Sequence, residues 1–126
     1  MVGTIAPMKS VQRAFDVIDA LWKLDGAGPT ELARTIDIPR STAHVYLQTL
    51  ASTEYVVGAD GTYELSHSFL SMGSRLKYRN QLYQVSHRSL RVLTDETDEI
   101  VTLVIEEAGE AVFLHNETVQ RRYRVA

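Results

Sequence analysis

The stretch PRSTAHVYLQTL, residues 39–50, places short hydrogen-bonding side chains at helical spacing. Its apolar residues recur with the period of one buried helix face, and they are Ala43, Tyr46, Leu47 and Leu50. The opposite face carries Ser41, His44, Val45 and Gln48. Hydroxyl and amide groups on a helix can approach base edges closely, and Val45 suits a thymine methyl group. Such a face fits recognition in a DNA major groove, but a solvated helix face is the commoner explanation of this pattern taken alone.

Two further predicted helices must position this stretch. Ser10 is a good N-cap, and a first helix is expected over residues 11–24, with an inner face formed by Val11, Ala14, Phe15, Ile18, Leu21 and Trp22. The next helix is short, with Gly28 as its cap and Pro29 at its first position. A turn at residues 37–39 ends it, and a third helix is expected over residues 39–53. A short helix, a tight turn and a second helix predict a helix-turn-helix, whose second helix enters the major groove.

Strands and further helices are predicted after the third helix. Residues 54–57 and 62–65 read as a small hairpin around a glycine-containing turn at 58–61, where a DNA-contacting wing would stand. Ser66 is expected to cap a helix over about residues 67–78, and Asn80 is expected to interrupt it before a helix at 81–96. Two strands, 100–106 and 111–117, follow. The predicted fold class is α+β, mainly α.

Several motifs in order carry a family resemblance. The segments are SVQRAFDVIDAL, GPTELARTIDIPRSTAHVYLQTLASTEYVV and DGTYELSHSFLSMGSRL. They resemble the N-terminal winged helix-turn-helix of the IclR family of transcription regulators, with its Pro-x-Ser-Thr-x-His helix, Leu-x-x-Leu and Gly-x-Tyr-x-Leu wing. The segment LYQVSHRSLRVLTDETDEIVTLVIEEAGEAVFLHNE resembles the linker helix and the start of the effector-binding domain. The resemblance implies a DNA-binding domain at residues 1–66, a linker helix at 67–80 and an incomplete effector-binding domain at 81–126.

The same resemblance implies which residues contact double-stranded DNA. It places on the recognition helix Arg40, Ser41, Thr42, His44 and Gln48, and in the wing Asp60, Gly61 and Thr62. Thr30, near the start of the second helix, is a phosphate-contact candidate. Val45 departs from the basic residue that family members often have after the histidine, so a thymine contact is expected there instead.

A homodimer is expected, because one short helix reads only a few base pairs and a palindromic site doubles the binding energy. The helix after the wing would form much of the dimer contact, through Phe69, Leu70, Met72 and Leu76. The resulting hypothesis is a sequence-specific regulator that acts by occlusion or recruitment at a promoter. The alternative is a winged-helix protein-interaction module that pairs through the same helix and the terminal hairpin without binding DNA.

Charge is distributed in blocks. Residues 1–66 hold five basic and eight acidic side chains, whereas residues 67–94 hold five basic side chains and no acidic one. Affinity for DNA normally comes from Lys and Arg side chains that neutralise phosphates. The acidic balance of residues 1–66 therefore argues for modest DNA affinity.

Other chemistry finds little support in the residue types. The chain has no cysteine, and its four histidines lack ligand-like spacing, so neither a metal nor a cofactor is expected. Neither a phosphate-binding loop nor a nucleophile elbow can be placed, so no enzyme is expected. Without a signal peptide or a membrane-length apolar run, a cytoplasmic protein is expected. Family members continue much further, so either the chain is a fragment or it lacks a sensor, and a small-molecule effector is expected only for a longer chain.

Overall fold

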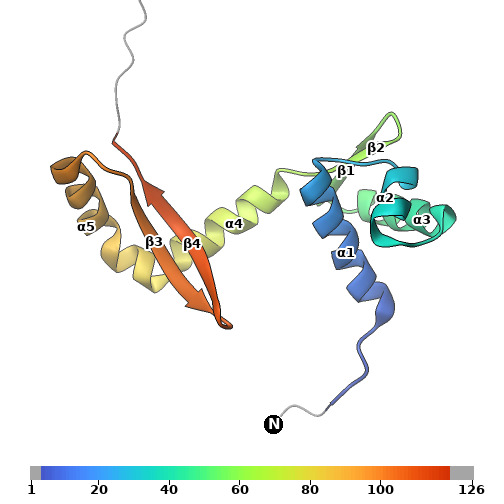
Figure 1. Ribbon diagram of the computed structural model, residues 1–126, viewed down its shortest axis with the longest axis horizontal. Coiled ribbons are helices and arrows are strands. Elements are labelled where there is room, and N and C mark those ends of the chain that lie inside the picture. The colour runs from blue at the N-terminus through green and yellow to red at the C-terminus, as the bar shows by residue number, and fades with distance from the viewer. Residues whose placement is uncertain (1–3, 120–126) are drawn as a thin grey trace, which may run out of the picture. The chain divides into compact units, whose positions relative to one another are not determined.

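The structure is a computed structural model that describes residues 4–119, and it divides into two compact units, Met1–Ser71 and Met72–Ala126. The first unit contains α1 (Lys9–Leu24), α2 (Pro29–Ile36), α3 (Arg40–Ala51), β1 (Val56–Ala59) and β2 (Thr62–Leu65) (Figure 1). Helix α4 (Ser68–Arg79) contains the boundary, and the second unit continues with α5 (Gln81–Thr97), β3 (Val101–Glu107) and β4 (Glu110–Glu117). The predicted fold class, α+β and mainly α, is confirmed. The domain limits 1–66, 67–80 and 81–126 stay a prediction.

The hydrophobic core of the first unit joins all three helices to the hairpin. Its buried members are Val17, Ala20, Leu21, Ala27, Leu32, Ala43, Leu47 and Val56. The inner face predicted for α1 is wrong at Val11, Phe15 and Trp22, which are 50%, 66% and 74% exposed. Of its other members, Leu21 is buried and Ala14 and Ile18 are half-buried. Helix α1 has two apolar stripes, and α2 and α3 pack on the one that contains Val17 and Ala20.

The helix boundaries follow local chemistry in most cases. Helix α1 begins at Lys9 with Met8 as its N-cap and no side-chain cap, so the predicted cap at Ser10 is wrong and Ser10 lies within the first turn. Helix α2 has the predicted Gly28 cap and Pro29 start, because proline has no N–H to leave unsatisfied there. Helices α1 and α2 both end at an aspartate with φ 54°, a conformation that Asp tolerates through local hydrogen bonding.

The β1–β2 hairpin turns more tightly than predicted. Val56 pairs with Leu65, and Ala59 pairs with Thr62, so only Asp60 and Gly61 form the turn. Their φ values of 54° and 78° are both positive, as a type I′ turn requires. The prediction of a four-residue turn at 58–61 was wrong because Gly58 serves packing, not the turn. A Cβ atom at Gly58 would lie 2.8 Å from the ring of its partner Tyr63.

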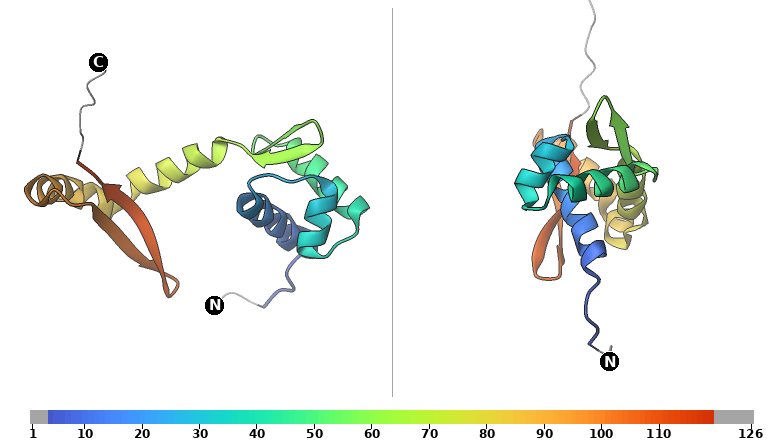
Figure 2. Two further views of the ribbon diagram at one scale, coloured as in Figure 1. Left: turned by 45° about the horizontal axis from the view of Figure 1, so that its top comes forward. Right: turned by 90° about the vertical axis from the view of Figure 1, so that its right-hand side faces the viewer.

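Backbone contacts fix this hairpin beside the start of α2. The N–H of Ala27 donates to the carbonyl of Tyr63 at 3.0 Å, and the N–H of Tyr63 donates to the carbonyl of Ala27 at 2.9 Å. Near the hairpin tip, a Cβ atom at Gly28 would come within 3.0 Å of the Gly61 carbonyl oxygen. The hairpin therefore lies against the α1–α2 turn, as the left view of Figure 2 shows.

The second unit is a helix against a hairpin. Asn80 caps α5, because its Oδ1 accepts a hydrogen bond from the N–H of Tyr83 at 3.1 Å. Helix α5 packs against both β3 and β4. It covers part of one face of this hairpin, on which the half-buried apolar residues are Val101, Leu103, Ile105, Val112 and Leu114. Phe113 on the other face is 74% exposed, and no apolar side chain within residues 72–119 is fully buried.

Aromatic contacts join α5 to β4. The ring of Tyr83 meets the ring of His115 edge to face, with centroids 5.1 Å apart. The Nε2 atom of His115 lies 2.6 Å from Oε2 of Glu117. Burial raises the pKa of Tyr83 above its usual value, and the negative charge of Glu117 and the neighbouring Tyr78 add to this.

Candidate nucleic-acid interface

Helix α3 presents the predicted polar stripe to solvent. Ala43 and Leu47 are fully buried, which fixes the rotation of the helix about its axis. The opposite side chains, Ser41, His44, Val45 and Gln48, are all exposed. Thr42 is half-buried and lies about 100° round the helix from Ser41, so it stands apart from this stripe.

The N-terminal turns of α2 and α3 lie together. The Nε atom of Arg40 donates a hydrogen bond of 2.8 Å to Oγ1 of Thr30, and both residues are exposed. Sequence reasoning singled out each residue separately, and the structure joins them. The pair presents a guanidinium and a hydroxyl at the start of α2, where free backbone N–H groups favour an anion.

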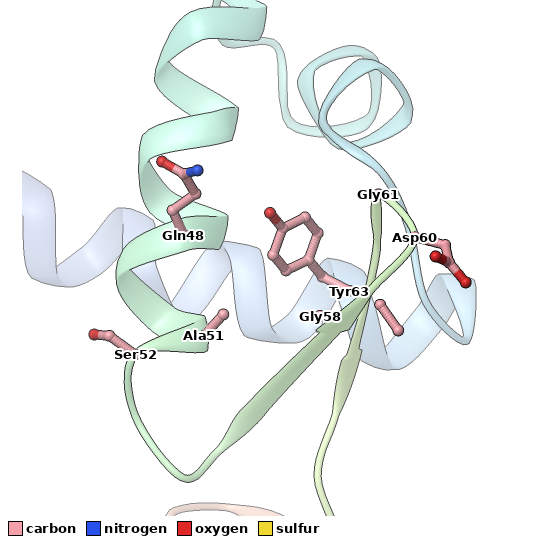
Figure 3. A pocket seen from close by; sticks show the side chains of 8 residues that line it. Gln48, Ala51, Ser52, Gly58, Asp60, Gly61 and Tyr63 are labelled. Atoms are coloured by element: carbon pink, nitrogen blue, oxygen red, sulfur yellow. The ribbon is translucent and has the colours of Figure 1, made fainter.

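The hairpin supplies a second element beside α3. Its tip residues Asp60, Gly61 and Thr62 are exposed, and the hairpin is held by the Ala27–Tyr63 bridge. This arrangement, a helix-turn-helix followed by an anchored hairpin, is a winged helix. A hollow of about 530 Å³ separates the hairpin from the C-terminal half of α3 (Figure 3).

Sequence reasoning missed two residues at this hollow, Ser52 and Tyr63. Ser52 lies four residues after Gln48, so helical spacing could have added it to the stripe. Tyr63 belongs to the Gly-x-Tyr-x-Leu wing motif, but its place at the hollow depends on the hairpin register and on the bare backbone of Gly58.

The site bears little charge. Among the exposed residues of the stripe, the wing tip and the Arg40–Thr30 pair, Arg40 is the cation and Asp60 the anion. Its chemistry is therefore mainly hydrogen bonding by hydroxyl, imidazole and amide groups, with one apolar contact at Val45.

The predicted dimer residues lie on α4 in different environments. Leu70, Met72 and Leu76 are 67%, 48% and 57% exposed. Phe69 is half-buried, and its ring packs on Tyr55 with centroids 5.4 Å apart. Phe69 therefore contributes packing within its own unit.

Neither a metal site nor a membrane span is found within residues 4–119. No group of three or more histidine, cysteine, aspartate or glutamate side chains in that range is placed to hold a metal ion. No helix in the same part of the chain is both long and apolar enough to cross a membrane.

The chain is similar to proteins named as HTH-type transcriptional regulators. The chain is 28% identical over 121 residues to the probable HTH-type transcriptional regulator ArcR of Halobacterium salinarum, covering 92% of this chain and 46% of that protein. It is 26% identical over 110 residues to the HTH-type transcriptional regulator KdgR of Escherichia coli, covering 86% of this chain and 42% of that protein. The chain thus spans less than half the length of these relatives.

Solved structures share the fold. The IclR of Thermotoga maritima is 20% identical, with a TM-score of 0.71 over 95% of this chain and 49% of that chain. An IclR family transcriptional regulator from Brucella abortus is 18% identical, with a TM-score of 0.73 over 94% of this chain and 48% of that one. The IclR helix-turn-helix domain family matches residues 10–59, from the second residue of α1 to the end of β1. Residues 10–59 are therefore an IclR helix-turn-helix domain.

Proposed function

We propose that this chain binds double-stranded DNA sequence-specifically and acts as a transcription regulator at a promoter. The observation that carries the proposal is the exposed stripe of Ser41, His44, Val45 and Gln48 on a helix whose other side is locked into the core. Such a helix, preceded by a tight turn and flanked by a wing, suits insertion into a major groove. The relatives named as transcriptional regulators support the same conclusion.

Each contact has a distinct role in this proposal. Ser41, His44 and Gln48 hydrogen-bond to base edges, and Val45 packs on a thymine methyl group. The Arg40–Thr30 pair binds a phosphate, and the wing tip, residues 60–62, lies along the sugar–phosphate backbone of the DNA. Thr42, half-buried beside the stripe, contributes at most at its edge.

The active form in this proposal is a homodimer, with Leu70, Met72 and Leu76 of α4 at the contact. A second exposed apolar stripe lies on α1, where Phe15 and Trp22 share one face of the helix, and we assign it to the dimer contact as well. Trp22 is the only tryptophan of the chain and reports directly on this contact. The fluorescence of Trp22 should shift to longer wavelength when dilution dissociates the dimer. If the mass shows dissociation but the emission does not change, Trp22 is not buried at the dimer contact.

Such a regulator acts at the chromosome, in the cytoplasm, by occlusion or recruitment. A small-molecule effector belongs to this proposal only for a longer chain.

The second candidate is a protein-interaction module that does not bind DNA. The exposed apolar side chains of α1 and α4 favour it, as does the acidic balance of residues 1–66. A salt titration separates the DNA-binding regulator from the interaction module. It measures binding of the purified chain to its promoter region and to random duplex, together with the mass of the complex. DNA binding weakens as salt rises, whereas an apolar protein contact does not. Absence of binding at low salt by folded protein would favour the interaction module.

Alanine variants test the assigned face. Gln48→Ala and Ser41→Ala should each reduce the preference for promoter over random duplex by roughly 1 kcal/mol or more, because each removes a side chain that hydrogen-bonds to a base edge. Gln12→Ala is the matched control, because Gln12 is an exposed glutamine on α1. Unchanged discrimination in both test variants would refute the face.

A further inference from the structure

The hollow between α3 and the hairpin has walls of small or neutral residues. Gln48, Ala51 and Ser52 line it from the helix, and Gly58, Gly61 and Tyr63 line it from the hairpin (Figure 3). Small side chains leave a space of about 530 Å³ open beside the candidate base-reading stripe. Figure 3 shows the carboxylate of Asp60, also at the rim, pointing away from α3.

Packing and backbone hydrogen bonds fix the position of Tyr63 at this hollow. Its ring crosses the bare backbone of Gly58, where a Cβ atom would come within 2.8 Å of it. Its backbone makes both hydrogen bonds of the bridge to Ala27. The phenol end points toward α3 in Figure 3, and its hydroxyl has no hydrogen-bond partner within residues 4–119. An oriented hydroxyl donor is therefore free at the hollow.

The hollow also continues the stripe on α3. Ser52 follows Gln48 by one helical turn, so the line of exposed positions 41, 45, 48 and 52 runs directly into it. A helix that lies in a major groove meets the sugar–phosphate backbone where it leaves the groove. Hydroxyl side chains commonly contact phosphates there.

We propose that this hollow holds the sugar–phosphate backbone of one DNA strand, and that the Tyr63 hydroxyl donates a hydrogen bond to a phosphate oxygen. The inference rests on the proposed function and adds a phosphate-binding residue to it. Because a phosphate contact carries no base information, Tyr63 contributes to affinity for every duplex. Gln48, one turn before Ser52, contributes to discrimination instead.

Tyr63→Phe tests this inference, because it keeps the ring over Gly58 and removes only the hydroxyl. The variant should bind the promoter and the random duplex more weakly by the same factor, about tenfold for each half-site, as expected for one hydrogen bond to a charged oxygen lost from each wing. Tyr55→Phe is the matched control, since Tyr55 is a half-buried tyrosine of the same unit that packs on Phe69. Equal thermal unfolding temperatures would show that both variants keep the fold.

Duplexes with a single neutral methylphosphonate linkage locate the phosphate. At one linkage beside the major groove that α3 occupies, the methylphosphonate should weaken binding by the wild-type chain and leave binding by Tyr63→Phe unaffected. Wild-type affinity of Tyr63→Phe for both duplexes, together with reduced discrimination in Gln48→Ala, would overturn the phosphate contact and keep the proposed function. A weakening confined to the promoter would assign Tyr63 to a base instead. Failure of the wild-type chain to bind any duplex would overturn both proposals.

Discussion

Removal of the wing carboxylate should strengthen DNA binding. Asp60 is exposed at the first position of the hairpin turn, where its φ is 54°. Asn is favoured at this position of a type I′ turn, so Asp60→Asn removes one negative charge without backbone strain. The thermal unfolding temperature should therefore be unchanged.

The magnitude follows from Coulomb's law in solvent. Asp60 is exposed, so the dielectric constant near water applies, and if the nearest phosphate is taken to lie about 7 Å away, the repulsion is about 0.6 kcal/mol. Its removal should tighten binding about threefold for one half-site and about sevenfold for a dimer with two wings on the duplex. The gain should disappear near 1 M salt, where the Debye length is about 3 Å.

Fluorescence anisotropy of a labelled random duplex at low and high salt measures this effect. Asp25→Asn is the matched control, because Asp25 ends α1 with the same φ of 54° and the same charge. A gain shared equally by both variants would reveal only a change of net charge. Weaker binding of Asp60→Asn at low salt, with an unchanged unfolding temperature, would refute the reasoning, because the carboxylate would then be a hydrogen-bond acceptor for a base.

Three further predictions concern the fold. Leu47→Ala should lower the free energy of unfolding by roughly 2–5 kcal/mol because Leu47 is fully buried, whereas Val45→Ala, 59% exposed on the same helix, should leave denaturant unfolding nearly unchanged. Asn80→Ala should remove the cap of α5 and destabilise the second unit by about 1 kcal/mol in hydrogen exchange, whereas Gln81→Ala should not. The raised pKa of Tyr83 favours its neutral form in the folded state, so this stabilisation is present below the ordinary tyrosine pKa and is lost as pH rises through the folded value. Absorbance titration should show one tyrosine that ionises at higher pH than the others and that is missing in Tyr83→Phe. If the difference between the wild-type and Tyr83→Phe titrations is that of an ordinary tyrosine, the prediction is wrong.

The sequence by itself determined the helix-turn-helix and the exposed stripe of α3. The alternation of Ala43 and Leu47 with polar residues allows only one face of that helix to enter a core. Pro29 and Pro39 likewise set the short length of α2 through constraints on single residues. These features depend on local periodicity and backbone chemistry, which the sequence carries in full.

Tertiary structure decided the rest of the first unit. Helix α1 offers two apolar stripes, and only the packing of α2 and α3 selects Val17 and Ala20 for the core and leaves Phe15 and Trp22 exposed. The turn length of the hairpin depended on the pairing of Gly58 with Tyr63, a contact across strands. The hollow beside α3 exists because the Ala27 bridge holds the hairpin in place. Each of these outcomes depends on contacts between segments distant in the chain, for which local periodicity gives no signal.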